Sequence, residues 1–253
     1  MEAVVITGAS AGIGEEFARQ LAVEGKHLVL VARRLERLET LAAELRERHN
    51  IEVACIDSDL ADPAAPEQLV QALADQQITV TGLVNNAGFG DRGSFVDLDL
   101  KRQLDMIQVN VTSLVDLTWR LVPQLKQASD AFVLNVASTA AFQAGPNMAI
   151  YYATKAFVLS FSEALHEELK KTGIAVSALC PGATASEFAQ EANMTDTLLF
   201  KSGTMTPEAV VSKALAGRRR AIVIPGLKNL ILVWLGKVSP RMITRRLAGM
   251  LQA

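Results

Sequence analysis

The sequence has few of the residues that hold metals or form disulfides. Its 253 residues include only 2 cysteines and 3 histidines. Cys55 and Cys180 each lie in an apolar, strand-like run, so we expect two small core residues and no disulfide. The histidines are scattered, and no Cys/His cluster has the spacing of metal ligands. The sequence therefore predicts no metal site.

The sequence also lacks a long apolar run and a strong net charge. No apolar stretch reaches the ~18 residues of a membrane span. The formal net charge of −2 gives no general attraction to nucleic acid. The chain enters a strand-like run at once, so we expect no signal peptide and a cytoplasmic location. Half of the residues are apolar, which suffices for the core of one large domain.

Three glycines follow the first strand-like run. A helical pattern of apolar residues starts soon after them, so we expect a helix to begin near Gly12. A strand, a glycine-rich turn and a helix form the first unit of a dinucleotide-binding fold, because the backbone there can approach a pyrophosphate at the helix N-terminus. The alternative is an ordinary strand–helix turn. The residues predicted to contact a cofactor here are Gly8, Ser10, Gly12, Ile13 and Gly14.

Two arginines, Arg33 and Arg34, follow the second strand-like run. An acidic side chain at this place binds the ribose 2′-hydroxyl of NAD, whereas an arginine suits the 2′-phosphate of NADP. The sequence therefore predicts NADP(H), with one of the two arginines pointing inward. Alternatively, both are solvated charges at the start of a charged helix.

Strand-like runs alternate with helical segments along the chain. This alternation predicts one α/β domain over residues 1–253, with a doubly wound parallel sheet of about seven strands and helices on both faces. Ligands bind such sheets at the carboxyl ends of the strands. The runs are Val4–Ile6, His27–Ala32, Ile51–Ile56, Leu83–Val84, Ala131–Val136, Ile174–Leu179 and, more loosely, Ala221–Ile224.

Asp59 and Leu60 follow the third strand-like run. Asp59 is placed to accept a hydrogen bond from the amino group of an adenine. Alternatively, Asp62 caps a helix that Pro63 opens, and Asp59 is a turn residue.

Tyr151 and Lys155 are four residues apart and share one face of a predicted helix. An adjacent ammonium lowers the pKa of a phenol, so Tyr151 can exchange a proton with a carbonyl or alcohol near neutral pH. Ser138, at the end of the fifth run, can hold the same oxygen. Alternatively, Tyr151 and Lys155 form an ordinary surface pair. Tyr152 is a weaker candidate, because Ala156 and not a lysine follows it one turn later.

Together these residues resemble the short-chain dehydrogenases/reductases, over about residues 3–182. The resemblance implies a Rossmann-like fold and hydride transfer between NADP(H) and a carbonyl or alcohol, with reduction of a ketone or aldehyde as the expected direction. It also implies a homo-oligomer. The motifs, in order, are Thr7-Gly8-x-x-x-Gly12-Ile13-Gly14, Asn85-Asn86-Ala87-Gly88, Asn110, Ser138, Tyr151-x-x-x-Lys155 and Pro181-Gly182.

The resemblance also implies a role for each matching residue. Tyr151 is the general acid/base, Lys155 lowers its pKa and binds the nicotinamide ribose, and Ser138 orients the substrate oxygen. Asn110 holds a helix distortion and a water in a proton relay. Where members that prefer NADP often carry a basic residue, this sequence has Ala11, so the NADP prediction depends on the two arginines. The implied cofactor contacts are Asp59, Leu60, Asn86, Ala87, Gly88, Tyr151, Lys155, Pro181, Gly182 and, less regularly placed, Thr184 or alternatively Ser186.

Two later segments fit the family pattern less well. Residues 183–205 mix polar and apolar side chains and are predicted to form a substrate lid. Residues 225–253 form two amphipathic helices, the second starting at Pro240 and carrying three arginines. We expect them to pack on their own domain or on another subunit, where they would wall off the substrate pocket, rather than on a membrane. The alternative functions are a non-enzymatic NADP-binding redox sensor and a membrane-surface reductase of lipid-like substrates.

Overall fold

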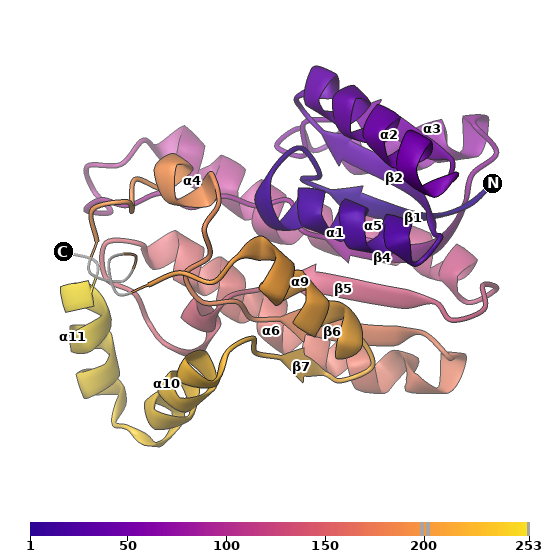
Figure 1. The fold of residues 1–253 in the computed structure, drawn as a ribbon. Coiled ribbons are helices and arrows are strands. Elements are labelled where there is room, and N and C mark those ends of the chain that lie inside the picture. Colours follow the sequence, from indigo (N-terminus) through magenta and orange to yellow (C-terminus); the bar gives the residue numbers. More distant parts are fainter. Residues whose placement is uncertain (198–199, 201–202, 252–253) are drawn as a thin grey trace.

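The protein is built on one parallel sheet of seven strands (Figure 1). The computed structural model describes residues 1–197, 200 and 203–251. The strand order is β3-β2-β1-β4-β5-β6-β7, and the paired strands run parallel. The predicted doubly wound sheet is therefore confirmed. The strands are β1 (Glu2–Thr7), β2 (His27–Ala32), β3 (Val53–Asp57), β4 (Thr79–Asn85), β5 (Phe132–Val136), β6 (Ala175–Leu179) and β7 (Ile222–Val223).

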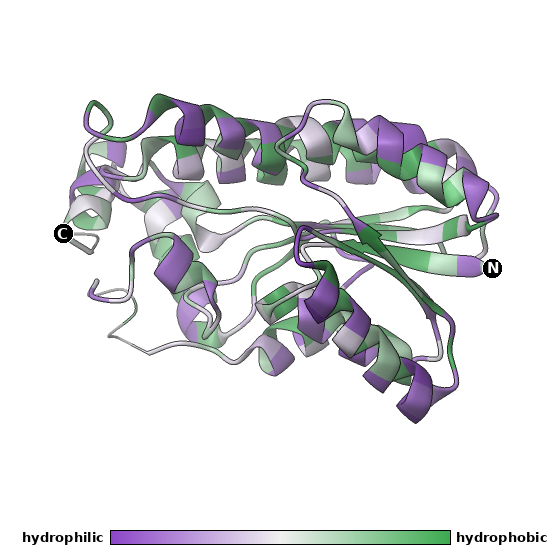
Figure 2. Ribbon diagram, turned by 90° about the horizontal axis from the view of Figure 1, so that it is seen from above, coloured by the Kyte–Doolittle hydropathy of each residue, from purple (hydrophilic) through white to green (hydrophobic). Residues whose placement is uncertain are grey.

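Helices cover both faces of this sheet, as the view from above shows (Figure 2). One face is covered by α1 (Gly12–Val23), α2 (Leu35–His49) and α9 (Pro207–Ala216). The other is covered by α3 (Ala65–Asp75), α5 (Ser113–Leu125) and α6 (Ala149–Leu169). The remaining helical segments are α4 (Leu100–Ile107), the π-helical turn η1 (Gln108–Thr112), the short turns η2 (Thr139–Phe142) and η3 (Lys170–Thr172), α7 (Phe188–Glu191), α10 (Leu227–Val238) and α11 (Arg241–Leu251).

The central strand β1 shows why an apolar run becomes a strand here. Val4 and Ile6 pack with the α1 side of the core, whereas Ala3 and Val5 pack with the α5 side. Successive side chains of a strand point to opposite faces, so a strand covered on both faces is apolar throughout. Because β1 pairs with both β2 and β4, the winding direction reverses beside it, and this reversal opens a crevice at the carboxyl ends of the strands.

The start of α3 differs from the prediction. The helix begins at Ala65 with Pro66 in its first turn, so Pro63 lies before it. Asp62 does not cap it, because its carboxylate accepts a hydrogen bond from the backbone N–H of Ala64 (2.9 Å). Asp62 thus forms a local turn around Pro63, and Pro66 takes the helical position where a missing N–H does no harm.

Both cysteines are free thiols, as predicted: Cys180 is buried and Cys55, in β3, is half-buried. Within the described residues no helix is long and apolar enough to cross a membrane. Residues 198–199 and 201–202 of the predicted lid, and residues 252–253 of the tail, lie outside the described part of the chain.

Candidate active site

A cavity of about 920 Å³ opens at the carboxyl ends of the strands. It extends from the turn between β1 and α1, past the ends of β4 and β5, to α6 and the C-terminal helices. Gly14 and Asn110 are the two predicted site residues that do not line it. The predicted residues that do are Gly8, Ser10, Gly12, Ile13, Arg33, Arg34, Asp59, Leu60, Asn86, Ala87, Gly88, Ser138, Tyr151, Lys155, Pro181, Gly182 and Thr184.

The glycines of the first turn allow close contacts within the protein. Gly8 has φ +65° and Gly12 has φ +58°, values that L side chains rarely adopt. A Cβ on Gly8 would lie 2.8 Å from Nδ2 of Asn86, and one on Gly14 would overlap the carbonyl oxygen of Gly8. Gly14 therefore lets α1 pack directly against the turn. Gly14 does not line the cavity, and its predicted cofactor contact stays a prediction.

Hydrogen bonds join the ends of β1 and β4 beneath this turn. Thr7 Oγ1 accepts from the backbone N–H groups of Asn86 and Ala87 (both 3.0 Å). The Asn86 side-chain amide donates to the carbonyl oxygens of Thr7 and Gly8 (3.0 and 3.1 Å). Thr7 and Asn86 thus fix the floor of the cavity on the side where α1 begins.

The N-terminus of α1 can hold an anion. Its N-cap residue, Ala11, makes no side-chain hydrogen bond to the first turn. The free N–H groups of the first turn, beginning at Gly12 and Ile13, lie at the wall of the cavity. The positive end of the helix dipole and these donors together suit a pyrophosphate.

Arg34 is the arginine that lies closest to this turn. Its guanidinium donates to Ser10 Oγ (3.0 and 3.2 Å) and pairs with the Glu187 carboxylate (2.8 Å). Glu187 also pairs with Arg37 (2.6 Å). Hydrogen bonds from Arg37 and Arg34 lower the pKa of Glu187. Arg33 is exposed and lines the same part of the cavity.

Asp59 lines the cavity and also acts as a turn residue. Its Oδ1 accepts from the backbone N–H of Ala61 (3.1 Å). The neighbouring Leu60 is buried, and its carbonyl accepts from Ser113 Oγ (2.8 Å). Both alternatives considered for Asp59 are therefore compatible, because one carboxylate oxygen is left for a second partner.

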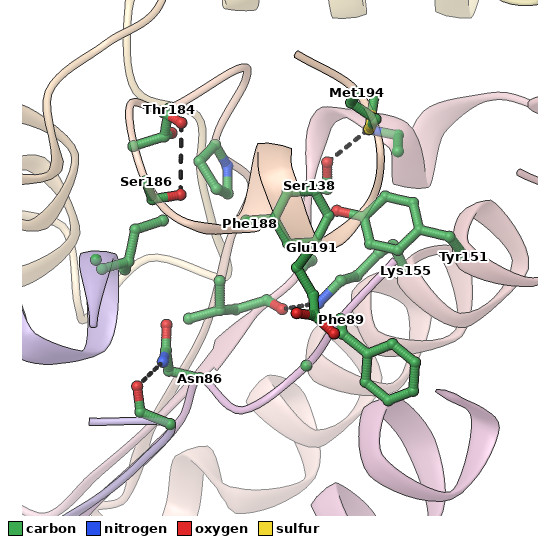
Figure 3. A pocket seen from close by; sticks show the side chains of 18 of the residues that line it. Asn86, Phe89, Ser138, Tyr151, Lys155, Thr184, Ser186, Phe188, Glu191 and Met194 are labelled. Atoms are coloured by element: carbon green, nitrogen blue, oxygen red, sulfur yellow. Dashed lines mark hydrogen bonds between the residues drawn. The ribbon is translucent and has the colours of Figure 1, made fainter. Parts of the chain in front are cut away.

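Ser138, Tyr151 and Lys155 converge at the opposite end of the cavity (Figure 3). Ser138 follows β5, and the other two residues lie one turn apart on α6. Lys155 Nζ is 5.8 Å from the centroid of the Tyr151 ring and donates to the Val136 carbonyl (2.8 Å). Phe188 packs on Tyr151 with a ring-centroid distance of 5.4 Å. Tyr151 and Lys155 are buried, so they are not an ordinary surface pair.

The pKa values in this group depend mainly on burial. Burial raises the pKa of Tyr151 above its usual range, and a hydrogen bond with Ser138 acts in the opposite direction. Burial also lowers the pKa of Lys155 to about 8. Burial therefore decides the direction of the net shift, and the contribution of Lys155 to the pKa of Tyr151 stays a prediction. At neutral pH Tyr151 is a phenol, ready to donate a proton.

Asn110 lies behind the cavity wall, in the π-helical turn η1 that interrupts the path from α4 to α5. This is the helix distortion that the resemblance implied. Its Nδ2 donates to the carbonyl of Phe89 (3.0 Å) and to Thr154 Oγ1 (3.1 Å), and its Oδ1 accepts from the N–H of Phe89 (3.1 Å). A Cβ on Gly88 would lie 2.9 Å from Asn110 Oδ1 and 3.4 Å from Lys155 Nζ. Asn110 thus positions the β4 loop against α6.

The Pro181–Gly182 pair continues from β6 along the cavity. The Pro181 carbonyl accepts from the N–H of Thr139 (2.9 Å), next to Ser138. A Cβ on Gly182 would lie 2.5 Å from Oδ1 of Asn229, so this glycine lets α10 approach. Thr184 Oγ1 donates to the Gly182 carbonyl (3.1 Å).

Described residues of the segment predicted as a lid line the cavity, and hydrogen bonds join the two ends of this segment. The N–H of Ala185 donates to the Met205 carbonyl, and the N–H of Met205 donates to the Ala183 carbonyl (both 2.9 Å). Two further ion pairs attach the described part of the lid to the domain. They are Arg92–Asp196 (2.8 Å) and Arg102–Glu191 (3.1 Å).

Sequence reasoning missed several residues around the cavity. Glu187 and Phe188 were placed in a lid, but nothing in the sequence indicated that they contact Arg34 and Tyr151. The C-terminal helices were only expected to wall the pocket, and the structure shows which of their residues do so. These are Asn229, Leu232, Val233, Leu235, Gly236, Ser239, Thr244, Leu247 and Ala248. In the described ranges no group of His, Cys, Asp and Glu is placed to hold a metal ion.

A sequence profile of the short chain dehydrogenase family matches residues 2–197. The chain belongs to this family. It is 37% identical over 179 residues to a very-long-chain 3-oxoacyl-CoA reductase of Laccaria bicolor, covering 69% of this chain and 52% of that reductase. The chain thus spans little more than half the length of that relative.

Two other similar proteins are matched over more of their length. A sulfoacetaldehyde reductase of Chromohalobacter salexigens is 40% identical over 192 residues, which cover 74% of each chain. The structure of a short-chain dehydrogenase from Sphingobium yanoikuyae in complex with NADPH matches with a TM-score of 0.82 and 36% identity, covering 90% of this chain and 89% of that one.

Proposed function

We propose that this protein reduces a bulky, apolar ketone with NADPH. The observation that supports this most is the cavity itself, which joins the α1 N-terminus and Arg34 at one end to Ser138, Tyr151 and Lys155 at the other. A dinucleotide can lie along this path with its nicotinamide beside Tyr151. The complete acid/base group argues against the alternative of a redox sensor without catalysis.

We assign the described residues to the parts of NADPH from one end of the cavity to the other. Arg34, with Arg33 beside it, would bind the 2′-phosphate, Asp59 and Leu60 the adenine, and residues 86–88 the adenosine side. The α1 N-terminus would hold the pyrophosphate. Lys155 and Tyr151 would bind the nicotinamide ribose, with residues 181–184 on the nicotinamide side. When bound, NADPH supplies the hydride that reduces the carbonyl carbon.

The protein's own residues would then supply the proton that the carbonyl oxygen takes up. Ser138 hydrogen-bonds the carbonyl oxygen, and Tyr151 donates its phenolic proton to that oxygen as the alcohol forms. The Lys155 ammonium stabilises the phenolate left behind. Asn110 would hold the water that returns a proton to Tyr151. The high pKa of Tyr151 suits reduction, in which the phenol acts as the acid.

The substrate end of the cavity supports a bulky, apolar substrate. Its walls come from the lid, α10 and α11, and include the apolar side chains of Phe188, Met194, Phe200, Val233, Leu235 and Leu247. The names of the two curated relatives differ in this respect: one acts on a very-long-chain 3-oxoacyl thioester and the other on sulfoacetaldehyde. The apolar walls favour the former kind of substrate, because burial of a long chain is favourable and burial of a sulfonate is costly.

Cofactor titration followed by turnover tests this proposal. We expect tight NADPH binding and weaker NADH binding in nicotinamide fluorescence. Arg34→Ala should weaken NADPH binding at least tenfold, because charge-assisted hydrogen bonds to the phosphate are lost, and should leave NADH binding unchanged. Arg48→Ala, at the far end of α2, is the matched control. A panel of long-chain 3-oxoacyl thioesters and polycyclic ketones should be reduced faster than sulfoacetaldehyde. Tight NADPH binding with no turnover of any carbonyl would instead support the redox sensor.

A further inference from the structure

Helices α10 and α11 present a wide apolar surface to solvent. Their inner side lines the cavity with the buried Val233, Thr244 and Ala248, and with Leu232, Leu235 and Leu247, which are also partly open to solvent. Their outer side is apolar but exposed, with Trp234 at 62% and Leu227 at 72% exposure. The other exposed apolar residues of these helices that do not line the cavity are Leu230, Ile231, Val238, Met242, Ile243 and Met250. A contiguous apolar surface of this kind marks an interaction site.

The arrangement on α10 is that of a helix lying at an interface. At 100° per residue, Leu227, Ile231, Trp234 and Val238 fall in one stripe, with Leu230 beside them. Lys228 and Lys237 fall at the two edges of this stripe, but the Lys237 ammonium lies 5.0 Å from the centroid of the Phe142 ring, on the protein's own domain. The exposed arginines of α11, Arg241, Arg245 and Arg246, can extend their charged ends to lipid headgroups. An exposed tryptophan is also typical of the membrane–water interface.

The charge of this segment has one sign only. Residues 227–253 contain five basic residues and no aspartate or glutamate, although the whole chain has a net charge of −2. The rest of the protein is therefore net negative, whereas residues 227–253 carry a net charge of +5. Figure 1 shows α10 and α11 together at one end of the molecule, away from β1–β4. The basic residues are Lys228, Lys237, Arg241, Arg245 and Arg246.

We propose that α10 and α11 dock the protein on the surface of an anionic phospholipid bilayer. The bilayer would cover the apolar stripe and neutralise the basic residues together. A second copy of the chain fits less well, because a two-fold contact through this face would bring basic residues against the same basic residues. This docking goes beyond the proposed reductase activity and does not depend on it.

The cavity lies next to the proposed docking surface. Residues of α10 and α11 line the cavity on one side and carry the apolar surface on the other. A bilayer on that surface would therefore lie one helix thickness from the substrate end of the cavity, about 10 Å. An apolar ketone dissolved in the membrane would reach the cavity without crossing bulk water.

The two tryptophans of the chain allow a direct test. Trp119 on α5 and Trp234 on α10 are both exposed. Trp119→Phe leaves Trp234 as the single fluorophore, and Trp234→Phe leaves Trp119 as its matched control. With phosphatidylcholine/phosphatidylglycerol vesicles, emission of Trp234 should shift to the blue and be quenched by brominated lipid. Emission of Trp119 should change little. Pure phosphatidylcholine vesicles or high salt should reduce the effect.

A charge variant separates the lipid from other occupants. Arg245→Gln/Arg246→Gln should lower co-sedimentation of the full chain with anionic vesicles at least several-fold. The matched control is Arg219→Gln/Arg220→Gln, an exposed pair outside the tail. Unchanged Trp234 emission with every vesicle would overturn the proposal. So would a Trp234 shift that follows protein concentration without lipid, which would identify a second copy of the chain as the occupant.

Discussion

The Glu187 carboxylate lies 2.8 Å from Nη1 of Arg34, whose guanidinium also contacts Ser10 beside the glycine turn. Glu187 comes from the lid, whereas Arg34 follows β2. The lid residue therefore occupies the donors that we assign to the 2′-phosphate. Binding of that phosphate and pairing with Glu187 are in competition.

Removing the charge of Glu187 should tighten NADPH binding. Both side chains are nearly half exposed, so the ion pair is weak and the expected gain is about two- to fivefold. NADH, which lacks the phosphate, should bind Glu187→Gln as it binds the wild type. Parallel fluorescence titrations check this, with Glu191→Gln, another paired lid residue, as the control. An equal gain for both cofactors would mean that Glu187 acts on the lid alone.

Tyr151→Phe should reduce turnover about 10²- to 10⁴-fold, which is the usual contribution of a proton donor. NADPH binding should stay within about twofold, since the ring and its packing on Phe188 are kept. Steady-state kinetics and cofactor titration check the two parts. Tyr152→Phe should remain active. An active Tyr151→Phe together with an inactive Tyr152→Phe would identify Tyr152 as the general acid.

The rate of reduction should fall as the pH rises above 8. Lys155 has a pKa of about 8 and loses its charge there, whereas the pKa of Tyr151 is raised and the phenol stays protonated. The phenolate that forms after proton donation then loses its stabilising ammonium. A pH profile of kcat checks this. A kcat that stays constant from pH 7 to 10 would show that the charge of Lys155 does not affect the rate of reduction.

Lys155→Met should stabilise the fold at pH 7 and do so less at higher pH. The pKa of Lys155 falls from 10.5 to about 8 on folding, so the unfolded chain holds the proton more tightly. Burial of the charged Lys155 therefore lowers the free energy of unfolding. This destabilisation is fully present below pH 8 and disappears as the pH rises to 10.5. After the loss of the hydrogen bond to Val136, we expect a net gain of about 1–2 kcal/mol at pH 7. Urea unfolding at pH 7 and pH 10 checks this, with Lys171→Met, at an exposed site, as the control.

Ser177→Ala should also raise stability. Among the described residues, Ser177 Oγ on β6 is buried and has no hydrogen-bond partner, so its burial is uncompensated. Removing it should add about 1 kcal/mol to the free energy of unfolding. Ser162→Ala should instead lower the free energy of unfolding. Ser162 Oγ accepts from the side-chain amide of Asn135 (2.9 Å) and donates to the Val158 carbonyl (2.6 Å), and both hydrogen bonds would be lost. Thermal melting of both variants compares the two serines directly.

The sheet and the end of each strand could be predicted because they depend on local patterns. Apolar runs gave the strands, and residues such as Arg34 and Ser138 follow strand ends, which parallel strands bring to one edge. The spacing of Tyr151 and Lys155 placed both on one helical face, and the structure buries them together.

What the sequence could not provide depends on contacts between distant segments. The pKa of Tyr151 depends on how deeply α6, the lid and β5 enclose it, and burial raises this pKa. Gly14 was assigned to the cofactor, but only the structure shows its contact with the Gly8 carbonyl. The pairing of Glu187 with Arg34 joins residues 153 positions apart, and no periodicity signals it.

The closed base of the lid fixes the two ends of the segment between Ala183 and Met205 beside each other, whatever residues lie between them. These ends are already held together by backbone hydrogen bonds, so lengthening or exchanging the residues between them adds little closure entropy. The sheet and the proton-donating group lie outside this segment. Grafting segments of other lengths and compositions onto this base should therefore reshape substrate choice while the sheet folds as before, provided that Phe188 and Glu187 keep their contacts with Tyr151 and Arg34.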